Sequence, residues 1–531
     1  MGPTKMAATT NLGLRRNAAQ LQALAGVERE VRAADPSGRR KYLRDFREAF
    51  RSYDSVLTAQ QLTGVVHAAD VVLIADYHAL PSSQQYAATL LEERAQPGDR
   101  PLVLGVETIF SRHQNILDEW WRREIEEDEF RERIRFDVDW GYEWSPFYRL
   151  LIAARENVEA IYGLDCMPRD DLRKIRARDR HAVDKIAEMR ERHPTAVILV
   201  LFGESHLAPQ HLPRVLRQRM PEERILTVLQ NTDALYWSAS SERQEQVDAV
   251  QVNDHVVCVF NSTPLEKYES YRQCLSRWGE EDRKHPDLAP SIYNLIDSLA
   301  NFLDVNRYSP HNTTQPRFFV DLLPEVYSGS SDARLRQVLG RTFHDPAKID
   351  NILRRVEETG CVYVPRINAF YIREFQMMHT AEEATRFLHQ ACRGLPARTA
   401  HPEAEGQASD RFYARSVEHA LAYLGSRVLY PARPAVRDEE GYNFTMNLCR
   451  ARMREGLRGN RKQFDDVALN LGYSLGSELY DAYLRGSVSR TVLRHLFLSH
   501  IEQPGVARQT CNEIIRKIHS SRKKPSASVR E

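Results

Sequence analysis

Three short apolar runs in the first half of the chain constrain its fold more than any other feature. Each is followed at once by acidic residues, histidines or both, and the runs are Val71–Ala75, Leu102–Val106 and Val197–Phe202. Runs this short and this apolar are typical of strands buried on both faces, as in a parallel sheet covered by helices. The sequence therefore predicts an α/β fold with a largely parallel sheet.

The residues that follow these runs are of types that bind metals or transfer protons. Asp76 and His78 follow the first run, Glu107 the second, and Glu204 and His206 the third. In open α/β sheets, ligands bind outside the carboxyl ends of the strands, so these side chains should converge on one site. Two imidazoles and a carboxylate form a common metal-binding set, which makes His78, Glu107 and His206 the expected ligands. The alternative is that each is an isolated loop residue or helix cap.

The carboxylates two residues before each histidine have a second expected role. In an extended segment, residues i and i+2 point the same way, so Asp76 should lie beside His78 and Glu204 beside His206. Each carboxylate is a candidate further ligand, orienting partner or general base. The three readings remain open from the sequence.

The rest of the first half alternates between strand and helix patterns. Three more strands are expected, at Val158–Gly163, Ile225–Leu229 and Val256–Phe260. The charged stretches Ser111–Ile134 and Asp170–Arg192 have helical patterns, and the second is most simply a solvated face. This alternation indicates βαβ units.

After about Trp278 amphipathic helices take over, so a mostly α-helical C-terminal region is expected. One exception, Cys361–Arg373, predicts a hairpin after two helices, an arrangement similar to a winged helix. The stretch lacks a dense basic face, so nucleic-acid binding is not expected. The expected organisation is a flexible arm (1–22), an α/β domain (23–280), a helical domain with the candidate hairpin (281–395), a linker (396–410), a second helical domain (411–519) and a disordered basic tail (520–531).

Composition narrows the class of protein. A chain of 531 residues is too long for one core, and its net charge of +1 gives no field that would attract nucleic acid or membrane. The seven cysteines are scattered and contain no CxxC, which suits a reducing compartment. We see no signal peptide, lipid anchor or membrane span, and we therefore expect a cytoplasmic protein.

Residues from about 60 to 240 resemble the ChaN family of haem-iron-binding proteins, within the Tiki, TraB and erythromycin-esterase superfamily. That superfamily is marked by two G-x-x-H motifs with a glutamate after a strand between them. The second motif is intact as Gly203-Glu204-Ser205-His206, and the glutamate stands in Leu104-Gly105-Val106-Glu107. The first motif appears as Ala75-Asp76-Tyr77-His78, without its glycine and with aspartate for glutamate. The segments Trp140-Gly141-Tyr142, Gly163-Leu164-Asp165 and Arg178-Asp179 are also ChaN-like.

The resemblance implies two activities. ChaN-like proteins bind haem or iron, which would place a divalent metal ion or haem iron at His78, Glu107 and His206. Tiki-like and erythromycin-esterase-like members instead cleave peptide or ester bonds, so the second hypothesis is a metal-dependent hydrolase with Glu107, Glu204 or Asp76 as the catalytic carboxylate. The ligand would then be a small molecule or a peptide.

Two further residues are candidates for cofactor contacts. Arg169 could hold an anionic group such as a haem propionate, or form only a surface ion pair. Tyr142, in an aromatic cluster, could line a flat cofactor pocket, although so dense a cluster is also typical of a packed corner. The resemblance leaves residues 281–531 uncovered, and a third hypothesis is a scaffold whose helical half binds a protein partner.

Overall fold

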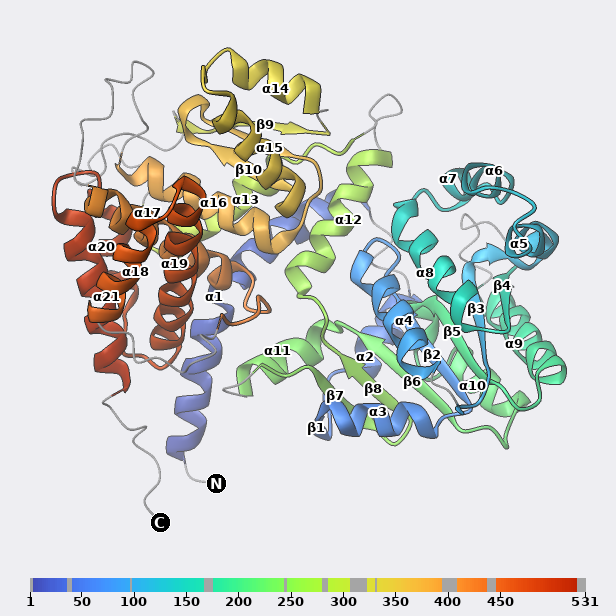
Figure 1. Cartoon of the computed structure of the whole chain (residues 1–531). Helices are drawn as coiled ribbons and strands as arrows, with labels where there is room; N and C mark the ends of the chain where they lie inside the picture. Colours follow the sequence, from blue (N-terminus) through green and yellow to red (C-terminus); the bar gives the residue numbers. More distant parts are fainter. Residues whose placement is uncertain are drawn as a thin grey trace. The chain divides into compact units, whose positions relative to one another are not determined.

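The computed structural model describes residues 3–35, 41–95, 98–166, 175–242, 246–278, 285–305, 322–329, 332–393, 408–436 and 446–522. The chain divides into two compact units (Figure 1). The α/β unit is Glu28–Glu281, and the helical unit is Met1–Val27 together with Asp282–Glu531. The division between them lies next to the change of character seen in the sequence near residue 280.

The α/β unit is built on one eight-stranded sheet with the order β1-β7-β8-β6-β2-β5-β3-β4. All strands are parallel to their neighbours except β7, which is antiparallel to β1 and β8. The expected fold class, a largely parallel sheet followed by a helical region, is therefore confirmed. The strands are β1 (Ser55–Leu57), β2 (Val71–Asp76), β3 (Leu102–Phe110), β4 (Ala160–Asp165), β5 (Val197–Gly203), β6 (Ile225–Gln230), β7 (Ala249–Asn253) and β8 (Val256–Val259).

The middle of the sheet holds the three strands that end in polar residues. β5 pairs with β2 on one side and with β3 on the other. Asp76 at the end of β2 lies opposite Gly203 at the end of β5. Every residue of these three strands is buried, because helices cover both faces of the sheet. The carboxyl ends of all three strands therefore lie side by side.

Alternate residues of each strand face two separate hydrophobic cores. Val72 and Ile74 face a core shared with α3, α4, α5 and α8, whereas Val71 and Leu73 face one shared with α2, α9, α10 and α11. This alternation is what the period of two in a strand requires. The helices of the unit are α2 (Lys41–Ala49), α3 (Ala59–Ala68), α4 (Pro81–Arg94), α5 (Gln114–Trp121), α6 (Glu127–Arg133), α7 (Phe136–Asp139), α8 (Trp144–Asn157), α9 (Ile175–Arg192), α10 (Leu212–Arg219), α11 (Asp233–Glu242) and α12 (Pro264–Trp278).

Three sequence expectations for this unit need correction. β1 and β7 were not predicted, because both are short and lie at the antiparallel end of the sheet. The stretch Ser111–Ile134 is not one helix: it divides into a 3-10 turn, α5 and α6, with Arg123 in a left-handed conformation (φ 61°) between the two α-helices. β3 continues to Phe110, so Glu107 lies inside a strand rather than after it.

The helical unit contains most of its residues in α-helices and one small sheet. β10 and β11 form the antiparallel hairpin expected around Cys361, and β9 adds a parallel third strand. The elements are α13 (Ala289–Phe302), β9 (Glu325–Ser328), α14 (Asp332–Gly340), α15 (Pro346–Thr359), β10 (Cys361–Val364), β11 (Ala369–Ile372), α16 (Met377–Arg393), α17 (Ala408–Leu429), α18 (Met446–Arg458), α19 (Arg461–Leu484), α20 (Arg490–Leu498) and α21 (Val506–Arg522).

The expected arm, linker and tail are described only in part. Residues 3–22 lie in helix α1 (Pro3–Ala34), where Ala19 is buried and Arg15 Nη1 donates to the carbonyl of Tyr483 at 2.9 Å. Most of the expected linker, residues 396–407, and residues 523–531 of the tail lie outside the described residues. The stretches expected as two helical domains fall in one compact unit. None of the described helices combines the length and apolarity needed to cross a membrane.

A buried ion network joins the helices of this unit. The carboxylate of Glu382 on α16 accepts hydrogen bonds from Arg386 Nη2 (2.5 Å), Arg433 Nη1 (2.8 Å) and the Tyr473 hydroxyl (2.8 Å). Burial alone would raise the pKa of this carboxyl, but the two guanidinium groups outweigh it and hold the pKa far below its usual range. Glu382 is therefore ionised in the folded protein.

His389, on the same helix, should make the helical unit sensitive to acid. Its side chain is 2% exposed, and burial, with the charges of Arg393 and Arg386, lowers its pKa well below 6.5. In the unfolded chain the imidazole of His389 is protonated below about pH 6.5, whereas in the folded protein it stays neutral. The free energy of unfolding therefore decreases as the pH falls through that value. We expect the wild type to lose up to about 1.4 kcal/mol per pH unit more than His389→Leu.

Urea unfolding followed by far-ultraviolet circular dichroism between pH 7.5 and 5.5 measures this difference. The exposed His495 on α20 provides the control, since His495→Leu should leave the pH slope unchanged. Equal slopes for the wild type and His389→Leu would contradict the prediction.

Candidate functional site

His78 is held at the end of β2 by the carboxylate two residues before it. Asp76 Oδ2 lies 2.7 Å from His78 Nδ1, and Asp76 Oδ1 accepts a hydrogen bond from the Gln84 amide on α4. Asp76 is 2% exposed, so water does not weaken either contact. A carboxylate on Nδ1 favours the tautomer with its proton there, which leaves Nε2 as the electron-pair donor.

Glu107 lies at the centre of the group. Its Oε2 accepts a hydrogen bond from the backbone N–H of Gly203, and its Oε1 accepts one from Arg178 Nη2 at 2.6 Å. The same guanidinium contacts Asp165 at 2.6 and 3.0 Å. Burial would raise the pKa of the Glu107 carboxyl, but His78, Arg178 and His206 outweigh it and lower the pKa. Glu107 is therefore a carboxylate.

His206 comes from the 3-10 turn Glu204–Leu207 that follows β5. Its Nδ1 lies 2.6 Å from Asp179 Oδ1 on α9. Its Nε2 lies 3.9 Å from Glu107 Oε1, while His78 Nε2 lies 3.5 Å from Glu107 Oε2. The structure thus brings together the three side chains that the sequence proposed as a group, with both Nε2 atoms directed to the same carboxylate.

Gly203 provides the room for this arrangement. A Cβ at this position would lie 2.9 Å from Glu107 Oε2 and 3.4 Å from His78 Nε2. Any larger residue would push into the space where the carboxylate and the imidazole meet. The glycine of the second motif therefore has a steric reason to be there.

Helix α9 contributes residues that sequence reasoning did not assign a role. Arg178 and Asp179 are 3% and 1% exposed, so the helix is not simply a solvated face. The only signal was that this pair belongs to the segments shared with the resembled family. The amphipathic pattern could not show which polar residues of so charged a helix point inward.

Glu204 and Tyr142 have different surroundings. Among the described residues no hydrogen bond or ion pair joins Glu204 to His206: Glu204 Oε2 lies 2.8 Å from Lys267 Nζ on α12, in a partly buried ion pair. Burial raises the pKa of the Glu204 carboxyl, and Lys267 opposes this. The ring of Tyr142 lies 5.2 Å from that of His78, beside Trp140 at 5.4 Å. Arg169 lies outside the described residues.

The family comparison matches the part of the chain that carries these side chains. A family model described as haem-binding uptake, Tiki superfamily, ChaN matches residues 62–218. This part of the chain, the ChaN-like domain, is therefore similar to that family. No curated protein and no solved structure matches the chain. The family description supports a small-molecule ligand of the haem or metal class, without saying which residues bind it.

The ChaN-like domain offers the donor types that a metal centre needs, but not a finished coordination group. Among the described residues, no three or more His, Cys, Asp or Glu side chains are arranged to hold a metal ion. A physical reason is that both oxygens of Glu107 already accept hydrogen bonds, one of them from a guanidinium. Ion binding would have to compete with Arg178 for this carboxylate.

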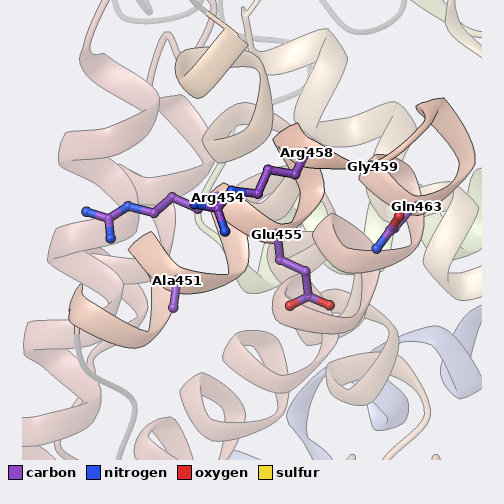
Figure 2. Close-up of a pocket in the computed structure, with 6 residues that line it drawn as sticks. All are labelled: Ala451, Arg454, Glu455, Arg458, Gly459 and Gln463. Carbon is purple, nitrogen blue, oxygen red and sulfur yellow. The ribbon is translucent and has the colours of Figure 1, made fainter.

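The cavities described are lined by other residues than those of the candidate site. One, of about 480 Å³, lies on α18 and the start of α19 and is lined by Arg454, Glu455, Arg458 and Gln463 (Figure 2). The other, of about 200 Å³, lies in the α/β unit between α10 and the β7–β8 turn. Neither is lined by His78, Glu107 or His206.

Proposed function

We propose that the ChaN-like domain binds a metal centre, a divalent ion or the iron of a haem, through Nε2 of His78 and His206 with Glu107 beside it. The observation that carries the proposal is the pair of carboxylate–imidazole contacts, Asp76 with His78 and Asp179 with His206. Metal-binding histidines characteristically donate their other ring N–H to a carboxylate in this way.

The separations between donors support a small ion. Bonds of about 2.1 Å from one ion to a nitrogen and an oxygen place those two atoms about 3–4 Å apart. The Nε2 atoms of His78 and His206 lie 3.5 and 3.9 Å from oxygens of Glu107. When bound, such an ion would supply Lewis acidity, and the chain would hold it by two oriented imidazoles and a carboxylate.

Haem iron would be bound by fewer of these residues than a bare ion, because the ligand must be accessible to a large flat molecule. The side chain of His78 is 13% exposed and that of His206 is 4% exposed, so His78 is the more accessible ligand. Rings of Trp140, Tyr142 and Phe147 lie 5.2 to 6.3 Å from its imidazole. Aromatic rings pack well against a flat macrocycle, so haem iron would be held through His78.

Elemental analysis and titration with haem of the full chain test the proposal. A bare ion should bind to the wild type and be lost in both His78→Ala and His206→Ala. A haem Soret shift should disappear in His78→Ala and persist in His206→Ala. His193→Ala is the control, because His193 lies in the same domain and its ring nitrogens contact Glu159 and Tyr162 rather than any residue of the site.

The proposal would be overturned if the wild type retained no metal after incubation with iron, zinc or manganese and gave no Soret shift with haem. Binding that His78→Ala leaves unchanged would also overturn it. Circular dichroism of each variant shows that the loss is not one of folding.

We do not extend the proposal to hydrolysis. Glu204, a candidate base, is occupied by Lys267, and Asp76 and Glu107 are held by Gln84 and by Arg178 respectively. A general base must reach the proton it removes, and these contacts direct the carboxylates to other partners. The third hypothesis, that the helical half binds a protein partner, stays a prediction.

A further inference from the structure

The cavity of about 200 Å³ in the α/β unit is not lined by His78, Glu107 or His206, although Leu207, which follows His206, is part of its wall. It lies between α10, the loop before that helix, β6 and the turn from β7 to β8. It combines an apolar wall, which includes Leu207, Pro213 and Val256, with five polar side chains, among them Thr227, Arg217 and Asp254.

The hydroxyl of Thr227 is buried without a partner. The residue is 1% exposed, and its Oγ1 accepts or donates no hydrogen bond among the described residues. The backbone N–H of Thr227 donates to the carbonyl of His255 at 2.9 Å, whereas the side-chain hydroxyl has no hydrogen-bond partner among the described residues. Buried hydroxyls are rarely left unsatisfied, and one that lines a cavity is suited to a ligand.

Arg217, which is half-buried on α10, and Asp254, which is exposed on the turn from β7 to β8, bring opposite charges to the same cavity. Burial lowers the pKa of the Arg217 guanidinium, and no carboxylate opposes this. Neither side chain forms an ion pair with the other or with any residue that the structure describes. A guanidinium binds a carboxylate through two parallel hydrogen bonds, and a carboxylate binds an ammonium group. A ligand carrying both groups would have an oppositely charged partner for each of them among the lining residues.

We propose that this cavity binds a small zwitterion with an apolar body, that is, a free aliphatic amino acid. Its carboxylate would contact Arg217, its ammonium group Asp254, and its side chain the wall of Leu207, Pro213 and Val256. At about 30 Å³ per water the cavity holds the volume of roughly seven waters, which suits an amino acid.

Isothermal titration calorimetry of the full chain with L-valine, L-leucine and L-methionine tests the proposal. At least one should give a saturable heat. Arg217→Gln should weaken its affinity about tenfold or more, the loss expected for a hydrogen bond between charged groups, and Asp254→Asn should do the same. Arg214→Gln is the matched control, because Arg214 is exposed on the same helix and does not line the cavity.

Thr227→Val separates binding from folding. Because the hydroxyl has no partner in the free protein, its removal should leave the thermal unfolding temperature unchanged or raised, while affinity falls about fivefold. Two analogues assign the charges: 4-methylpentanoate lacks the ammonium group of leucine, and isopentylamine lacks the carboxylate. Both should bind more weakly than leucine. No saturable heat with any of the three amino acids, or equal binding of 4-methylpentanoate and leucine, would overturn the proposal.

Discussion

Replacing Arg178 by methionine is expected to destabilise the α/β unit by about 3–5 kcal/mol, the usual loss when one partner of a buried ion pair is removed. Arg178 is 3% exposed and is the guanidinium shared by Glu107 and Asp165. Methionine fills similar volume, so packing changes little, but two carboxylates are left buried without their cation. The loss of stability therefore reports the removal of the positive charge and not the creation of a cavity.

The sequence offers a reporter for this unit alone. All six tryptophans lie between residues 120 and 278, within the α/β unit. Urea unfolding followed by tryptophan fluorescence therefore follows this unit without a contribution from the helical one. Arg180→Met is the control, since Arg180 is exposed on the same helix and should change stability by less than about 0.5 kcal/mol. A difference of less than about 1 kcal/mol between the two variants would refute the expectation.

The second large effect is expected in the helical unit. Glu382→Gln keeps the shape of the side chain but removes the charge that Arg386 and Arg433 share. Two guanidinium groups would then lie buried without a carboxylate at their centre, although Glu383 still contacts Arg386 at 3.1 Å. We expect a loss of about 3–5 kcal/mol in the unfolding of this unit.

Far-ultraviolet circular dichroism and tryptophan fluorescence together localise this loss. The dichroism of Glu382→Gln should show an earlier transition, while the fluorescence transition, which belongs to the α/β unit, stays where it is. Glu357→Gln, an exposed change on α15, should leave both transitions in place. If the dichroism transition of Glu382→Gln coincided with that of the wild type, the ion network would contribute nothing to the stability of this unit.

The sheet could be predicted from the sequence, and for a physical reason. Strands buried on both faces must be apolar along almost their whole length, so Val71–Ala75 and Val197–Phe202 stand out against the charged helices between them. The convergence of His78, Glu107 and His206 followed from the rule that parallel strands end at the same edge. Glu107 was placed correctly in space although it lies inside β3.

The supporting contacts could not be predicted. Asp179 reaches His206, and Arg178 reaches Glu107, from a helix whose sequence is charged on every side. Which of its polar residues face the core depends on the rotation of α9 against the sheet. Lys267 lies 63 residues after its partner Glu204, and no pattern in the sequence links the two. Pairings of this kind follow from tertiary packing alone.

The strand order has a consequence for how the domain can be made. β2 and β3 precede β5 along the chain, yet β5 lies between them in the sheet and is synthesised about 90 residues after β3. A nascent chain that ends before Val197 therefore lacks the strand that pairs with β2 and β3. Unpaired strand edges of this kind can form hydrogen bonds with other chains. When β5 is made, it pairs with both of these edges and brings His206, in the turn that follows it, to the site.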